Sequence, residues 1–284
     1  MASISIAPPL PRARAPFASL SALFTLARRR FALTARTPRE LFVPLLTPVL
    51  FAVVIAPALK EALGGFRGGG IDYESFVAIA TVGLLVPLNM MFSGIGVIID
   101  RETGARRELL AAPIRRSLLV FGNLTVALAV TALQLTALIV AAVLRGIHFS
   151  PTVGGVAWAF AAVALFAIGM YGVAETLANR IPRQEEYIAA TPAVAIVPWF
   201  FAGTLFPIGS LPGALTIVAK VLPLTHALAL IRYGLLDHSG AGLHDIWGMS
   251  NTTTMAFLSL GVVALFAAAT TTLAIKVFQK AAVQ

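Results

Sequence analysis

Six stretches of this chain are apolar over a length that can cross a lipid bilayer. A spanning helix needs about 20 predominantly apolar residues, and backbone in lipid must be helical to satisfy its own hydrogen bonds. The stretches lie at residues 41–59, 75–99, 117–144, 152–177, 187–208 and 252–275. We therefore predict an all-α membrane protein with six transmembrane helices, a domain over residues 41–275, and short tails at 1–40 and 276–284.

Composition agrees with a membrane protein and excludes several kinds of site. Only 12% of the residues are charged, whereas a soluble domain has roughly a quarter. Cysteine is absent, so no disulfide, cysteine zinc site or thiol nucleophile can form. The histidines, His148, His226, His238 and His244, do not have a metal-ligand spacing. We predict no catalytic site, no metal site and no cofactor bound by this chain.

The positions of the basic residues predict the orientation in the membrane. Sixteen of the 21 Lys and Arg residues precede the first stretch, follow the last, or lie in the second and fourth connections. The positive-inside rule then places both termini in the cytoplasm, in a multi-pass protein of the cytoplasmic membrane. The same rule explains the net charge of +9 without a nucleic-acid partner. Forty residues before the first stretch are too many for a cleaved signal peptide.

The segment from Phe17 to Ala35 predicts a helix that lies in the membrane interface. Its apolar residues are interrupted by the triplet Arg28, Arg29 and Arg30, so it is too charged to span. The apolar side would enter the acyl boundary and the arginines would meet anionic headgroups. A plain topology anchor is a compatible alternative.

Two connections carry more information than the rest. The cytoplasmic connection at 100–112 is highly charged and compatible with a helix up to Pro113. It would present charges and leucines to a soluble partner, or it would be an ordinary solvated loop. The external connection at 209–250 is too apolar to lie in water as coil, so we predict a re-entrant helical hairpin. Its marked residues are Pro207, Pro212, Pro223, His226 and Arg232, and Lys220 and Arg232 would snorkel to the surface.

Polar residues inside the predicted spans are candidates for a substrate route. They include Asn89, Asn123, Gln134 and Glu175. For the amides, hydrogen bonds between helices are the plainer alternative, and for Glu175 the alternative is an ion pair with Arg180 or Arg183. Gly94 and Gly96 would permit close contact with a neighbouring helix.

Two motifs carry a family resemblance. The stretch DRETGARRELLAAPI, from Asp100 to Ile114, resembles the signature that follows the second span in type-2 ATP-binding-cassette (ABC) exporter permeases. The stretch from Phe200 to Arg232 is similar to the family's fifth span and external hairpin. The likeness is greatest to permeases that export daunorubicin-like drugs and lipo-oligosaccharides. Leu222 departs from the family, because many members have asparagine before the proline.

The resemblance implies a permease subunit of an ATP-driven exporter of an amphipathic drug, lipid or lipid-linked glycan. Two permeases would pair, as copies or as paralogues, above two ABC ATPase subunits. The 17–35 segment would be the elbow helix and the 100–112 segment the coupling helix. The coupling residues would be Asp100, Arg101, Glu102, Gly104, Arg106, Arg107, Glu108 and Pro113.

The sequence supports the expectation that ATP is hydrolysed by a separate subunit. The chain contains no G-x-x-x-x-G-K-[ST] phosphate loop, so ATP and Mg²⁺ are expected on the partner ATPase. An ion-coupled secondary transporter of a hydrophobic substrate is the alternative, and it would want several carboxylates at mid-membrane or internal repeats. An intramembrane enzyme would want a catalytic cluster at membrane depth. The spans have one candidate carboxylate and no such cluster.

Overall fold

The structure is a computed structural model that describes residues 16–36, 42, 45–46, 49–55, 57–58, 61, 67–68, 71–112 and 114–281. Its helices are α1 (Pro16–Arg36), α4 (Tyr73–Glu102), α5 (Ala105–Ala111), α6 (Ser117–Leu144), α7 (Val153–Arg180), α8 (Gln184–Ala195), α9 (Val197–Phe201), α10 (Gly213–Val221), α11 (Pro223–Leu235), α12 (Ala241–Trp247) and α13 (Thr252–Ala281). A π-helix, η1 (Phe51–Ile55), and a 3-10 turn, η2 (Ile208–Ser210), are shorter. Strands β1 (Arg67–Gly68) and β2 (Ile71–Asp72) form one antiparallel pair.

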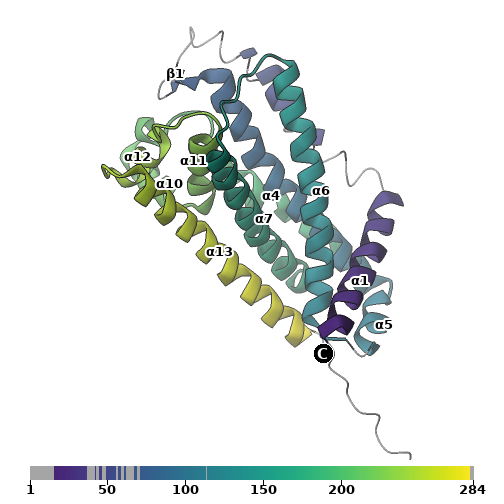
Figure 1. The fold of residues 1–284 in the computed structure, drawn as a ribbon. Helices are drawn as coiled ribbons and strands as arrows, with labels where there is room; N and C mark the ends of the chain where they lie inside the picture. The colour runs from purple at the N-terminus through teal and green to yellow at the C-terminus, as the bar shows by residue number, and fades with distance from the viewer. Residues whose placement is uncertain are drawn as a thin grey trace, which may run out of the picture.

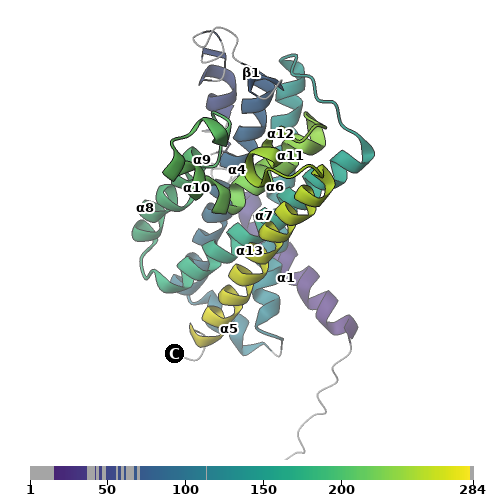
Figure 2. The same ribbon diagram turned by 90° about the vertical axis from the view of Figure 1, so that its left-hand side faces the viewer.

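The long helices run between two ends of the molecule, which we name by the elements found there. Figures 1 and 2 show α1, α5 and the end of α13 gathered at one end, which we call the α5 end. Strand β1 and helices α11 and α12 lie toward the other end, which we call the hairpin end. The hairpin is the pair α10 and α11.

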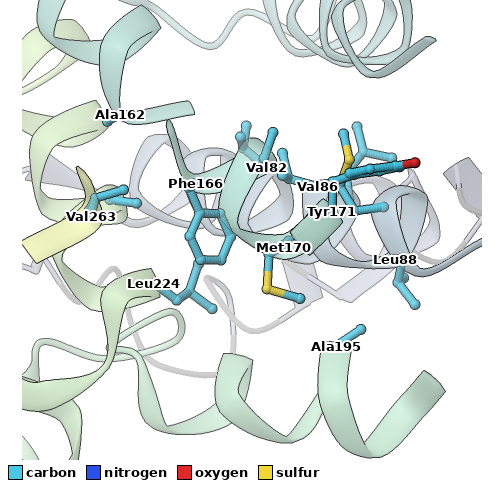
Figure 3. Packing of buried hydrophobic residues seen from close by; sticks show 14 of the residues in the cluster. Val82, Val86, Leu88, Ala162, Phe166, Met170, Tyr171, Ala195, Leu224 and Val263 are labelled. Atoms are coloured by element: carbon cyan, nitrogen blue, oxygen red, sulfur yellow. The ribbon is translucent and has the colours of Figure 1, made fainter. Parts of the chain in front are cut away.

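Helix α4 lies at the centre of the bundle. In its most apolar 18-residue window 83% of the residues are buried, compared with 33% in α6, 39% in α7 and 22% in α13. Helices α6, α7, α8 and α11 all pack against α4, and α13 packs along α7. Figure 3 shows Val82 and Val86 of α4 beside Phe166 and Met170 of α7 in this core. Surrounding helices thus shield α4, while α13 keeps most of its surface outward.

Four helices agree with predicted spans. The predictions at 75–99, 117–144, 152–177 and 252–275 lie in α4, α6, α7 and α13, which are all long and apolar enough to cross a membrane. Thr152 caps the start of α7, because its hydroxyl accepts a hydrogen bond from the Gly155 amide at 3.0 Å. Of the first predicted span, 41–59, the structure describes residues 42, 45–46, 49–55 and 57–58, which include η1, and this stretch is not among the candidate spans found in the described residues.

The fifth prediction, a single helix over 187–208, differs from the structure. Helix α8 ends at Ala195, α9 ends at Phe201, and the chain then turns at Gly203, where φ is 71°. Pro192 and Pro198 explain the interruption, because a proline has no amide hydrogen for the helix ladder. The short helix α9 is held to α4 by Trp199, whose indole N–H donates to the carbonyl of Ala80 at 2.8 Å.

The connection at 209–250 is helical, as expected, and bent. Helices α10 and α11 meet at 80°, and Pro223 is the first residue of α11. Pro212 likewise stands directly before α10, and Pro207 directly before η2. Proline suits these positions because the first amides of a helix have no partner inside the helix. By length and apolarity, the pair is either one broken span or a re-entrant hairpin.

Candidate functional site

Helix α1 is anchored to α4 through two arginines at the α5 end. The guanidinium of Arg29 donates to the carboxylate of Asp100 at 2.9 Å. Arg30 is 8% exposed, and its guanidinium lies against Gly96, where any Cβ atom would overlap it. The prediction that the arginine triplet meets headgroups was therefore wrong for Arg30; Arg29 is partly exposed and paired with Asp100, and Arg28 is exposed. Charges held away from water need partners, and α4 supplies a carboxylate for Arg29 and space over a glycine for Arg30.

The end of α4 is anchored to the end of α7. Arg101 donates to the carbonyls of Ala178, Ile181 and Pro182 at 3.0, 2.9 and 2.7 Å. The chain then turns at Gly104, where φ is 78°, a conformation that glycine adopts without strain. The predicted coupling helix at 100–112 is thus shorter in the structure, because residues 100–102 still belong to α4 and α5 covers only Ala105–Ala111.

Helix α5 has an inward and an outward side. Arg106 lies inward, with its guanidinium carbon 4.9 Å from the centre of the Phe278 ring at the end of α13. Burial lowers the pKa of Arg106 from its ordinary value; Glu175 opposes this shift and Arg101 adds to it. The exposed charged residues of this segment are Glu102, Arg107 and Glu108. Pro113 lies outside the described residues.

Glu175 of α7 lines the same small cavity as Arg106 and is 1% exposed. Its carboxylate accepts hydrogen bonds from the Tyr171 hydroxyl at 2.8 Å and from the Asn179 amide at 3.0 Å. The alternative of an ion pair with Arg180 or Arg183 was wrong: among the described residues Glu175 has no salt bridge, Arg180 is exposed, and Arg183 pairs with Glu186 at 3.3 Å. The partners of Glu175 are instead one helical turn away on its own helix, where i and i+4 side chains meet.

A small cavity links these charged groups. It has a volume of about 30 Å³ and is lined by residues of α1, α4, α5, α6, α7 and α13, among them Arg29, Asp100, Arg106 and Glu175. That volume suits about one water molecule. One Nη atom of Arg106 is buried without a hydrogen-bond partner among the described residues, so a bound water would satisfy it. Five of the six helices at this end therefore contribute a charged or aromatic side chain to one contact region, which we call the α5 junction.

The other polar candidates do not gather in one cavity. The Asn89 amide donates to the Thr131 hydroxyl and to the Ala127 carbonyl, and so joins α4 to α6. Asn123 lines two small cavities, one with Asn89 and one with Glu175. Gln134 is 2% exposed in α6 and lines neither of them. For Asn89 the structure agrees with the alternative of a bond between helices.

Close contact at the α4 glycines is confirmed. The Tyr187 hydroxyl of α8 lies over Gly94 and donates to the Met91 carbonyl at 2.8 Å. Arg30 occupies the equivalent space over Gly96. Two glycines in α4 therefore receive a side chain each from α8 and α1.

Buried hydrogen bonds hold the hairpin end together. Arg232 is 7% exposed, and its guanidinium donates to the carbonyls of Gly203 at 2.9 Å and of Phe76 and Thr204 at 3.4 Å each. The predicted snorkelling of Arg232 was wrong, because these carbonyls and the Phe76 ring, 3.6 Å from the guanidinium carbon, replace water. Lys220, in contrast, is exposed as predicted.

His226 joins the two hairpin helices to α13. Its Nε2 lies 2.9 Å from the Lys220 carbonyl, and its Nδ1 lies 3.1 Å from the Ser259 hydroxyl. The Trp247 indole donates to that same hydroxyl at 2.8 Å. The neutral imidazole with its proton on Nε2 satisfies this chain, in which Ser259 donates to Nδ1. In the described part of the chain, no group of His, Asp and Glu is arranged to hold a metal ion.

Comparison with known proteins identifies the family. The family model for the ABC-2 type transporter matches residues 21–236, a range that runs from α1 through the α5 junction to the end of α11. The chain belongs to the ABC-2 type transporter family. The earlier resemblance to type-2 ABC permeases is thereby confirmed.

Two relatives support the family assignment. A Porphyra purpurea protein named as a transport permease, ycf38, is 26% identical over 211 residues, covering 73% of this chain and 72% of that protein. Nodulation protein J of Sinorhizobium fredii (strain NBRC 101917 / NGR234) is 26% identical over 179 residues, covering 62% of this chain and 67% of that protein. An ABC-2 permease with several apolar helices is a membrane protein, as the sequence predicts.

Sequence reasoning missed several residues of the α5 junction in this ABC-2 chain. The sequence pattern predicts Arg29 and Arg30 at anionic headgroups, and no local pattern marks Tyr171, Asn179 or Phe278. One usable signal was present: Gly96 stands one helical turn before Asp100, so a small residue and a carboxylate share one side of α4. That pattern suits a packed arginine helix.

Proposed function

We propose that this chain is the membrane-spanning subunit of an ATP-driven exporter for an amphipathic molecule such as a drug, a lipid or a lipid-linked glycan. Two such chains, or this chain and a paralogue, would form the route, with both termini in the cytoplasm. ATP and Mg²⁺ would bind two separate ATPase subunits. The six-span topology would be completed by the 41–59 stretch and by the broken helices between Gln184 and Leu235.

One observation carries the proposal, namely the two-sided character of α5. Its inward side, with Arg106 against Phe278, is tied to the bundle, whereas Arg107 and Glu108 are exposed, as is Glu102 at the end of α4 just before it; none of the three has a described salt bridge. A short helix that exposes charges of both signs suits a groove on a soluble partner better than contact with lipid.

The contacts of the α5 junction suggest how motion of a docked ATPase would reach the spans. Displacement of α5 would move α4 through the short turn at Gly104, and α4 is the central helix of the bundle. It would also act on α1 through the ion pair between Arg29 and Asp100 and on α7 through Arg101. ATP binding can drive the permease only if the two permease states differ in their affinity for the closed ATPase pair.

The test is charge reversal at two exposed acids, one in α5 and one at the end of α4 just before it. The double variant Glu102→Lys and Glu108→Lys, co-expressed with the ATPase encoded nearest to this chain, should lose ATPase co-purification and ATP-dependent transport at least tenfold. The matched control is Glu61→Lys, an exposed acid in the connection predicted to lie on the opposite side of the membrane. Unchanged co-purification and transport in the double variant would contradict the docking role of α5.

A secondary transporter is the competing function, and the buried carboxylate of Glu175 is the feature that favours it. Reconstituted vesicles distinguish the two. Transport by the complex should require ATP and stop with vanadate, and a proton gradient alone should not drive it. Uptake driven by a proton gradient in vesicles that hold only this chain would reject the proposed function.

A further inference from the structure

An apolar cavity lies inside this single chain, near the hairpin end and away from the α5 junction. Its volume is about 250 Å³, and α4, α6, α7 and α11 supply most of its wall. Representative lining residues are Val82, Leu138, Ala142, Ala159, Val163 and Ile231. Its charged lining residues are Glu74, in the first turn of α4, and Arg145, which directly follows the last residue of α6.

The cavity reaches the surface of the isolated chain. Phe160, Val156 and Ile139 line it, and they are 75%, 49% and 41% exposed in the isolated chain. They belong to α6 and α7, in which 33% and 39% of the most apolar window is buried. We take this surface to face the bilayer, whose hydrocarbon would then be the medium outside the opening.

Neither water nor a void suits this space. A buried water needs two to four polar partners, and the wall consists mainly of Val, Leu, Ile, Ala and Phe side chains. An empty cavity of this size would forfeit dispersion contacts on every side. A flexible hydrocarbon chain, available at high concentration from the neighbouring bilayer, removes both costs.

Arg145 gives this cavity a polar rim at one end. Its side chain is exposed, and its guanidinium donates to the Val53 carbonyl at 3.2 Å, which leaves other N–H groups for an anion. Glu74 already interacts with another group of the protein. An apolar wall that ends at a guanidinium matches an acyl chain that ends at a phosphate.

We propose that this cavity holds one acyl chain of a membrane phospholipid, with the lipid phosphate at Arg145. At interior packing density, the volume accommodates roughly eight or nine methylene groups. The bound lipid would fill the wall between α4, α6 and α7 on the hairpin side of the bundle. The site needs membrane insertion but not coupling to an ATPase, so it stands apart from the proposed function.

The test measures phospholipid retained by the purified full-length chain. After extensive washing in detergent, lipid extraction and native mass spectrometry should find about one tightly held phospholipid per chain. The variant Ala142→Phe fills the cavity from α6 and should reduce retention at least about fivefold. Ala137→Phe is the matched control, since it makes the same change at an exposed position of α6 outside the cavity, and it should retain lipid as the wild type does.

Two further variants keep the test decisive. Arg145→Gln should weaken retention about threefold, because it removes the charge but not the cavity. If Ala142→Phe does not fold, Ala142→Leu and Ala137→Leu repeat the comparison with a smaller side chain. Equal retention in the Ala142 and Ala137 variants, or recovery of a non-lipid amphiphile in place of phospholipid, would overturn the proposal. Lipid retention is measured without an ATPase. Failure of the lipid proposal therefore does not imply failure of the proposed transport function, or the reverse.

Discussion

The two ends of the molecule hold arginines between their helices in different ways. At the α5 end, Arg29 faces a carboxylate on another helix and Arg30 lies over the bare backbone of Gly96. At the hairpin end, Arg232 bonds three backbone carbonyls from two distant segments. A side-chain ion pair can break and re-form when helices shift, whereas a cation shared by three carbonyls fixes all of them together. We therefore expect the α5 end to move and the hairpin end to stay rigid.

The largest effect should come from removing Arg232. Arg232→Met keeps much of the side-chain volume but leaves the carbonyls of Gly203, Thr204 and Phe76 without this donor. Buried unpaired polar groups each cost about 1–3 kcal/mol, so we expect a loss of about 3 kcal/mol in the free energy of unfolding. Denaturant titration in detergent would measure it. A loss below about 1 kcal/mol would contradict the rigid role of this arginine.

The next effect should come from the contact between α1 and α4. In Gly96→Ala the new methyl group overlaps the guanidinium of Arg30, and we expect a cost of about 1–3 kcal/mol from overpacking. Gly154→Ala in α7 is the matched control, because a Cβ there meets nothing within 4 Å. The control should be neutral or stabilising by up to about 1 kcal/mol, since alanine favours a helix. Similar stability of the two variants would show that the Arg30 side chain can leave Gly96 at little cost, so that this contact does not hold α1 to α4.

A smaller effect should come from the ion pair at the α5 end. The Arg29 side chain is 35% exposed and the Asp100 side chain 12%, so water screens the pair. A double-mutant cycle with Arg29→Gln and Asp100→Asn should give a coupling of about 0.5–1 kcal/mol that weakens in high salt. In the Arg29→Gln and Asp100→Asn variants, ATP-dependent transport should fall clearly while the free energy of unfolding changes little. A coupling near zero, with transport intact, would remove this pair from the path between α5 and α1.

The smallest effect on stability should come from the outward side of α5. Glu108→Lys replaces an exposed side chain, and such changes usually alter stability by no more than about 0.5 kcal/mol. Thermal unfolding should therefore match the wild type even where ATPase co-purification is lost. Lower stability in this variant would mean that Glu108 has a role within the fold, and the contrast between the two sides of α5 would be weaker.

Much of this architecture was readable from the sequence. Long apolar stretches predict α4, α6, α7 and α13 because a helix must satisfy its backbone within lipid. Prolines predict the interruption before α11, and the charged run predicts an exposed segment after α4. Pro192 and Pro198 predict a kink in the 187–208 stretch, but its division into α8 and α9 does not follow from the sequence, because a proline in an apolar stretch can either bend a helix or end it.

Tertiary structure alone decided which groups face inward. The most apolar windows of α4 and α13 have mean hydropathies of 2.1 and 2.0, yet 83% of one and 22% of the other are buried. Hydropathy measures removal from water, and lipid and protein interior are about equally apolar, so the sequence cannot distinguish the two. In the same way, Arg29, Arg30 and Arg232 read as surface charges until distant helices supply a carboxylate, a glycine surface and three carbonyls. Those partners lie tens of residues away or more, and only the folded chain brings them together.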